Sequence, residues 1–155
     1  MFKDVPLVTK IIEGPKFDYK TTSREAILAK MVEDMEFAVQ WVPEQKDMKE
    51  IGLVNKGACR MLLSKLYLAT GQWEKAIQQL NEVIDNSGYS LMTNTFGTFV
   101  TPFNTETWPI QRNVIWDLHR PENKLIAENK EVILGMPNRG IGSSNSFVAF
   151  NTMRA

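Results

Sequence analysis

The side chains that could recognise a polar ligand gather between residues 93 and 124. Trp108 stands in an irregular segment rich in Thr, Asn, Phe and Pro, where no periodicity requires an apolar residue. A flat aromatic ring with a polar tip suits the C–H faces of a sugar, although aromatic residues also anchor long loops. Guanidinium and amide groups follow within a short stretch of chain. The candidate ligand-binding residues are Trp108, Arg112, His119, Arg120 and Asn123.

The pair His119-Arg120 has two interpretations. A guanidinium fork beside an imidazole can bind an anionic sugar or a carboxylate. An isolated pair of this kind before Pro121 is also common as a purely structural feature. Both interpretations remain open at the level of sequence.

Acidic residues in the same stretch raise the question of catalysis. Glu106, Asp117 and Glu122 could supply the two carboxylates of a glycosidase. That chemistry requires a separation of roughly 5–10 Å between the two groups, and nothing in the spacing of these residues enforces it. We therefore predict no catalytic residue and a protein that is not an enzyme.

The inventory of metal ligands and charges excludes several other functions. The chain has one cysteine, Cys59, and one histidine, His119, which is too few for a transition-metal site. We predict no cofactor, although abundant oxygen ligands leave calcium open. The 18 basic and 18 acidic residues balance, so nucleic-acid binding is not expected.

Three helices are expected to position these residues, near 22–42, 55–70 and 72–87. Thr22-Ser23-Arg24-Glu25 matches a capping box at the start of the first helix, and Pro43 should end it. Asn55 can cap the second helix, which is apolar nearly all round and therefore belongs between two layers. The third helix is sharply amphipathic, and Gly88 can end it.

The apolar pattern also predicts which residues form the core. Trp41 and Trp73 fall on helical stripes and are predicted to be buried, as is Cys59. The most buried positions should include Leu62, Leu66, Ala76 and Leu80.

The segments after the third helix are expected to be less regular. One or two helical turns are predicted at 113–120, a short strand at 131–134 and a loop at 135–145.

Residues 54–88 resemble a tetratricopeptide repeat, a hairpin of two antiparallel helices. The residues that carry this resemblance are Tyr67, Gly71, Trp73, Ala76, Leu80 and Val83. Only one clear copy is present, and a solenoid needs about three repeats for stability, so neighbouring repeats must lie elsewhere. The predicted fold is mainly α, with tetratricopeptide-like helical hairpins, loop-rich flanking segments and little strand.

A second resemblance covers nearly the whole chain and is to the central region of SusD/RagB-type nutrient-binding proteins. Its motifs are Asp4-Val5-Pro6-Leu7, Thr22-Ser23-Arg24-Glu25, Asp34-Met35-Glu36-Phe37-Ala38, Lys56-Gly57-Ala58, Gly88-Tyr89-Ser90-Leu91, Trp116-Asp117-Leu118-His119-Arg120-Pro121-Glu122-Asn123-Lys124, Asn129-Lys130-Glu131-Val132-Ile133 and Met153-Arg154. No short motif is decisive alone, and the resemblance depends on their order and spacing.

The SusD/RagB resemblance implies a non-catalytic lipoprotein on the outer membrane at the cell surface. Such a protein binds extracellular oligosaccharides, or in some members peptides, for import through a SusC-like TonB-dependent transporter. Contact with the membrane would be only through a lipid anchor, and no lipidation signal precedes Cys59. The chain is then expected to be part of a longer protein.

The expected parts of this partial domain are an extended arm (1–21), a helical region (22–88) and an irregular region (89–155). Two alternatives to glycan capture remain: an interaction scaffold that docks another protein, and a glycoside hydrolase.

Overall fold

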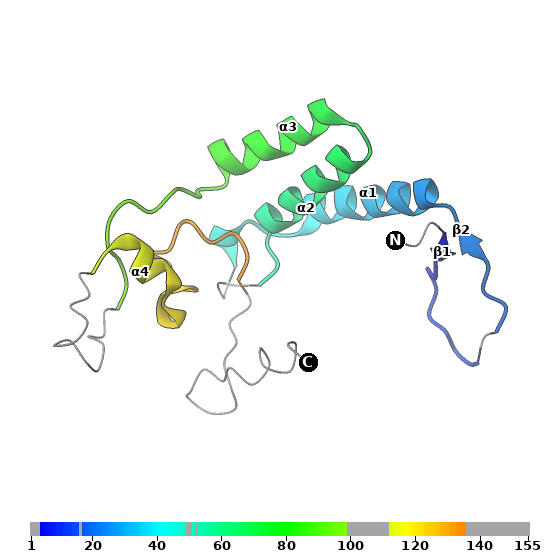
Figure 1. Cartoon of the computed structure of the whole chain (residues 1–155), viewed down its shortest axis with the longest axis horizontal. Coiled ribbons are helices and arrows are strands. Elements are labelled where there is room, and N and C mark those ends of the chain that lie inside the picture. The colour runs from blue at the N-terminus through cyan, green and yellow to red at the C-terminus, as the bar shows by residue number, and fades with distance from the viewer. Residues whose placement is uncertain (1–3, 16, 49–50, 52, 99–111, 136–155) are drawn as a thin grey trace.

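The computed structural model of the 155-residue chain describes residues 4–15, 17–48, 51, 53–98 and 112–135. Helices dominate this part of the chain, as expected, and its one sheet has two very short strands (Figure 1). The elements are β1 (Val5–Pro6), β2 (Thr21–Thr22), α1 (Arg24–Trp41), η1 (Gln45–Asp47), α2 (Lys56–Ala69), α3 (Trp73–Asn81), η2 (Glu82–Asn86), α4 (Val114–His119) and η3 (Pro121–Asn123). None of the described helices is long and apolar enough to cross a membrane.

The first predicted helix is confirmed, but its cap lies one residue later than the predicted capping box. The backbone N–H of Ala26 donates to the Ser23 hydroxyl at 3.3 Å, which makes Ser23 the capping residue. Thr22 instead pairs with Val5 in the β1–β2 ladder. At the other end, Val42 is extended (φ −71°, ψ 133°), which is the geometry that Pro43 favours in the residue before it.

The second and third helices form the predicted hairpin. Gly71 adopts a left-handed φ of +74° in the turn, and the N–H of Gln72 donates to the Tyr67 carbonyl at 2.8 Å. α3 continues into η2, a π-helical turn that lengthens it to Asn86, and Gly88 follows with a φ of +74°. α2 packs against both α1 and α3, as its apolar circumference predicts. We call residues 24–86 the helical layer.

The core of the helical layer lies around α2. Its buried members are Val32, Leu63, Leu66, Tyr67 and Ala76, with Leu28, Met35 and Val39 packed against them. The predicted burial of Cys59, Leu66 and Ala76 is confirmed. Leu80 is only half-buried. Leu62 is 46% exposed, so its predicted burial is wrong; it lines an apolar groove between α1, α2 and residues 131–134, and Leu63 fills the core instead.

The predicted burial of two tryptophans is also wrong. Trp41 is 72% exposed and Trp73 is 60% exposed. The inward stripe of α1 repeats through Val32, Met35 and Val39, and Trp41 falls on the opposite side by helical spacing. There its ring lies 6.0 Å from that of Phe37, centroid to centroid.

Asn55 joins the helical layer to the segments that follow it. Its side chain is fully buried, and its Oδ1 caps α2 by accepting from the N–H of Ala58 at 2.8 Å. The same oxygen accepts from the Tyr89 hydroxyl at 3.1 Å, and Nδ2 donates to the Ile133 carbonyl at 2.7 Å. The strand predicted at 131–134 is absent, because side-chain hydrogen bonds such as this one, rather than a neighbouring strand, hold that backbone.

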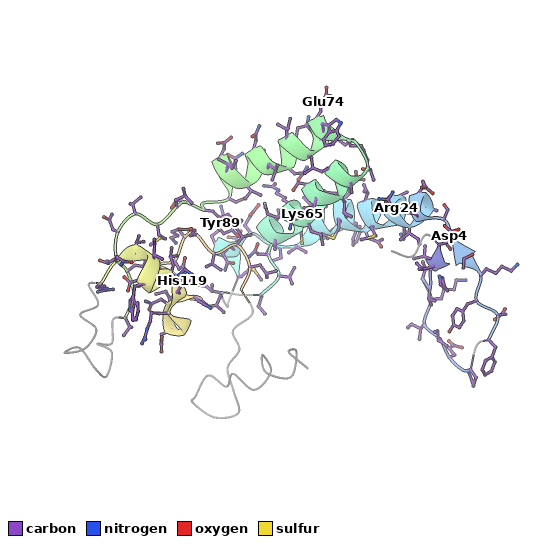
Figure 2. All side chains as sticks on the ribbon, in the orientation of Figure 1. Asp4, Arg24, Lys65, Glu74, Tyr89 and His119 are labelled. Carbon is purple, nitrogen blue, oxygen red and sulfur yellow. The ribbon has the colours of Figure 1, made fainter. Side chains whose placement is uncertain are left out.

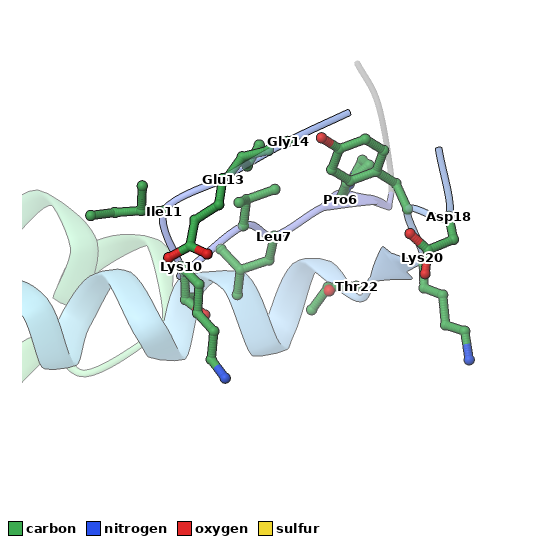
Figure 3. A pocket seen from close by; sticks show the side chains of 13 residues that line it. Pro6, Leu7, Lys10, Ile11, Glu13, Gly14, Asp18, Lys20 and Thr22 are labelled. Carbon is green, nitrogen blue, oxygen red and sulfur yellow. The ribbon is translucent and has the colours of Figure 1, made fainter. Parts of the chain in front are cut away.

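The chain before α1 forms a loop of its own. Val5 pairs with Thr22 and Pro6 with Thr21 in antiparallel register, so residues 7–20 project from the helices (Figure 1). The loop encloses a hollow lined only by its own residues (Figure 3), and Ile11 is 92% exposed. Among the described residues no other element lines this hollow, so it is an open ring of chain.

Candidate functional site

The segment after the helical layer is organised around a buried aspartate. Asp117 lies on α4 and has no exposed surface. One carboxylate oxygen accepts from the backbone N–H of Phe96 at 3.0 Å, and both accept from Nε of Arg112 at 3.0 and 3.1 Å. Arg112 also donates through Nη2 to the carbonyls of Phe96 at 2.8 Å and Gly97 at 3.1 Å. The ion pair therefore holds residues 96–97 against α4.

A buried amide holds the next residues of the same segment. Asn123 is fully buried, and its Oδ1 accepts from the N–H of Thr98 at 2.9 Å while Nδ2 donates to the Thr98 carbonyl at 3.1 Å. Gly97 permits this approach with a φ of +63°, since a Cβ there would lie 2.5 Å from the Asn123 oxygen. Asn129 in turn donates to the Asn123 carbonyl at 3.0 Å. We call residues 89–98 and 112–131 the polar-cored region.

α4 presents a second group of side chains to solvent. The helix begins where the Asn113 side chain accepts from the N–H of Trp116 at 2.9 Å. Ile115 is 65% exposed and His119 is exposed. The guanidinium of Arg120 lies 5.9 Å from the centroid of the Trp116 ring, within the range of a cation–π contact.

The hydrogen bond of His119 indicates the tautomer of its imidazole ring. Nδ1 lies 2.8 Å from the Ile115 carbonyl, which can only accept, so Nδ1 carries the proton. In the neutral imidazole, Nε2 is then a hydrogen-bond acceptor. A sugar hydroxyl could donate to it.

The predicted site residues therefore separate into two groups. Arg112 and Asn123 meet at residues 96–98, where Asn123 is buried and both side chains bond to backbone. His119 and Arg120 lie at the end of α4, and Figure 2 shows His119 in this part of the molecule, away from the three long helices. Trp108 lies outside the described residues, as does Glu106.

Two of the carboxylates considered for catalysis have structural partners. Asp117 is buried in its ion pair with Arg112. Glu122 lies 3.3 Å from Nε of Arg120, as an ion pair without hydrogen-bond geometry. Among the described residues there is also no group of three or more acidic, histidine or cysteine side chains placed to hold a metal.

Sequence reasoning missed Trp116 as a member of this surface. Its indole Nε1 is buried and forms no hydrogen bond within the described part of the chain. The signal was present in the spacing, because Trp116 precedes Arg120 by four residues and so shares a helical face with it.

Comparison with known proteins identifies the fold. No family model matches the sequence, and no match was found among curated proteins. Among solved structures, a SusD-like protein from Bacteroides fragilis is 23% identical over 87% of this chain, with a TM-score of 0.61. A laminarin-binding SusD-like protein is 29% identical over 61% of this chain, with a TM-score of 0.51. The chain spans 23% and 22% of the lengths of these two proteins. These likenesses confirm the SusD/RagB resemblance seen in the sequence, and the chain has the SusD-like fold over the segment that it spans.

Proposed function

We propose that the chain is part of a non-catalytic protein that binds oligosaccharides, and that residues 93–124 contribute to the ligand surface. The observation that carries this proposal is the 29% identity to a solved SusD-like protein that binds laminarin. The chemistry of α4 supports it. An exposed imidazole acceptor, a guanidinium and an aromatic ring lie within one helical turn of one another.

The helical layer is poorly suited to hold a sugar. Its buried side chains are committed to packing around α2, and the buried Tyr67 hydroxyl already donates to Glu36 at 2.6 Å. The groove between α1, α2 and residues 131–134 is lined mainly by aliphatic and methionine side chains. A sugar placed there would leave most of its hydroxyl groups without partners, which costs free energy.

Within the polar-cored region, the four remaining candidate residues are proposed to act in two ways. His119 and Arg120 contact the ligand. Arg112 and Asn123 hold residues 96–98 and so fix the start of the segment that contains Trp108. Trp108 is proposed to stack on a sugar ring, which contributes on the order of 1–3 kcal/mol.

A calorimetric titration tests the ligand surface. Laminarin oligosaccharides, oligosaccharides of other linkages and short peptides are titrated into the wild type, Trp108→Ala and Arg120→Ala. Each variant has a matched control in the helical layer, Trp41→Ala and Arg24→Ala, because these residues are exposed and lie on α1.

We expect one glycan class to bind, with about tenfold or greater loss in Trp108→Ala and no loss in either control. Thermal melting confirms that each variant is folded. Unchanged affinity in folded Trp108→Ala and Arg120→Ala would contradict the assignment of these two residues. Binding of peptides alone would replace glycan as the ligand class, and turnover of a glycan would contradict the non-catalytic role.

We further propose that this binding serves import through a SusC-like TonB-dependent transporter at the outer membrane. The SusD-like fold supports this partner and this location. Co-purification from detergent-solubilised outer membranes tests it, with the tagged full-length protein as bait and a transporter of this class identified by mass. Recovery of the protein in the cytosolic fraction, without such a transporter, would contradict it.

A further inference from the structure

Both arginines of the polar-cored region have a carboxylate partner from the same region. Nε of Arg112 donates to the two Asp117 oxygens at 3.0 and 3.1 Å, and Asp117 has no exposed surface. Nε of Arg120 lies 3.3 Å from a carboxylate oxygen of Glu122. The chain itself therefore compensates the charge of each guanidinium.

This compensation matters because guanidinium groups are the cations best suited to bind an acidic sugar. A planar guanidinium can hold a carboxylate through two parallel hydrogen bonds, whereas a lysine ammonium is a strongly hydrated point charge. Residues 112–131 also contain as many acidic as basic residues, so this stretch offers no net positive charge to attract an anion. The acids are Asp117, Glu122, Glu128 and Glu131, and the bases are Arg112, Arg120, Lys124 and Lys130.

Glu122 is the carboxylate that a ligand at the end of α4 would meet. It belongs to η3, which follows α4, and its side chain is 49% exposed. A carboxylate of the ligand that reached Arg120 would lie close to Glu122, and like charges repel. A sugar hydroxyl carries no charge and avoids this repulsion. Selectivity of this kind depends on what a site rejects as well as on what it binds.

We propose that the sugar unit in contact with α4 is uncharged, and that Glu122 excludes acidic sugars from this position. The proposal rests on the proposed function, because it requires Arg120 to contact the ligand. It concerns only the unit at α4 and not the charges of other segments of a longer protein. Of the two interpretations of His119-Arg120 drawn from the sequence, it sets aside the binding of an anionic sugar.

A matched pair of oligosaccharides tests this selectivity. One is neutral, and the other has the same linkage and length but its C6 hydroxymethyl groups are oxidised to carboxylates. Calorimetry at low and high salt measures both affinities for the wild type, Glu122→Gln and the control Glu128→Gln. The control removes the same charge from an exposed acid to which no ion pair is found among the described residues.

We expect the wild type and Glu128→Gln to bind the neutral form about fivefold or more tightly than the acidic form, since two like charges about 4 Å apart in water repel by about 1 kcal/mol. In Glu122→Gln this preference should fall to about twofold or less, and binding of the acidic form should weaken with salt. Tighter binding of the acidic form by the wild type, or the same preference in Glu122→Gln, would overturn the proposal.

A monosaccharide titration separates failure of this inference from failure of the proposed function. Methyl glucoside and methyl glucuronide are added while NMR follows the Nε–H of Arg120. We expect a saturable shift with glucuronide in Glu122→Gln and none in the wild type. A panel in which no oligosaccharide binds contradicts the proposed function. A glucuronide shift in the wild type, or no such shift in Glu122→Gln, overturns this inference whether or not an oligosaccharide binds.

Discussion

The helical layer and the polar-cored region are stabilised by different interactions. The helical layer surrounds α2 with aliphatic and aromatic side chains, and its buried residues touch one another. In the polar-cored region the buried side chains include Asp117, Asn123 and Asn129, and they bond mainly to backbone. Apolar packing depends on volume, whereas hydrogen bonding to backbone depends on direction. Apolar packing suits a scaffold, and hydrogen bonding to backbone fixes the conformation of an irregular segment.

The largest loss of stability is expected for a substitution in the apolar core of the helical layer. Leu63→Ala removes a side chain that is 1% exposed, and should lower the free energy of unfolding by roughly 2–5 kcal/mol. Leu62→Ala, one residue away and 46% exposed, should cost less than about half as much. Urea denaturation followed by circular dichroism measures both. Equal losses in the two variants would contradict the placement of the core.

The next effect concerns the buried ion pair of the polar-cored region. Asp117→Asn keeps the shape but removes the charge that Arg112 and the Phe96 N–H bond to, and should cost about 1–3 kcal/mol. Glu122→Gln is the control, since its half-exposed ion pair with Arg120 should contribute at most about 1 kcal/mol.

Hydrogen exchange shows where the Asp117→Asn loss occurs. We expect faster exchange at Phe96 and Thr98 and unchanged exchange in α2. Uniform acceleration along the chain would mean that the two regions unfold as one unit rather than separately.

A smaller effect concerns the hydrogen bond between the Tyr67 hydroxyl and Glu36 in the helical layer. Burial, and then the hydrogen bond to Glu36, raises the pKa of Tyr67 from 10.0 to about 12. The folded state therefore holds this proton more tightly than the unfolded state does. The stabilisation is complete below pH 10 and is lost as the pH rises from 10 to about 12.

Tyr67→Phe tests that linkage. At neutral pH it should cost roughly 0.5–1.5 kcal/mol. Because the phenyl ring does not titrate, the difference from wild type should shrink as the pH approaches 12. Chemical denaturation at several alkaline pH values measures the difference. A difference that stays constant over this range would contradict the pKa assignment.

The smallest effect is expected at an exposed aromatic. Trp41→Ser should change the free energy of unfolding by no more than about 0.5 kcal/mol, because the side chain is 72% exposed on the outer face of α1. The same denaturation experiment measures it. A loss comparable to that of Leu63→Ala would show that Trp41 is covered in solution.

The two regions also differ in how far the sequence predicts them. Helical periodicity, Asn55, Pro43 and Gly88 give the helices and most of their ends, because these signals are local. Periodicity alone does not orient each helix about its axis, so it predicts a buried Leu62, whereas Leu63 fills the core. Helical stripes and residue type predict that Trp41 and Trp73 are buried, but the inward stripe of α1 leaves out Trp41, and Trp73 lies 60% exposed at the start of α3.

The sequence predicts the polar-cored region only in part. The sequence predicts one or two helical turns at 113–120, and α4 (Val114–His119) confirms them. The bonds from Asp117 to Phe96 and from Asn123 to Thr98 join residues more than 20 positions apart, and no local pattern indicates such contacts. The chemistry of Arg112 and Asn123 predicts ligand contacts, and in the structure both side chains donate hydrogen bonds to backbone carbonyls.

The central proposal is that the polar-cored region, and not the helical layer, binds the glycan. The most direct measurement is a map of amide chemical-shift changes by heteronuclear NMR as laminarin oligosaccharides are titrated into the chain. The account predicts that the largest changes fall at residues 112–123 and at the indole N–H of Trp108, with little change in α2 and α3. Changes centred on α2 or α3 while the amides of 112–123 stay fixed would contradict it.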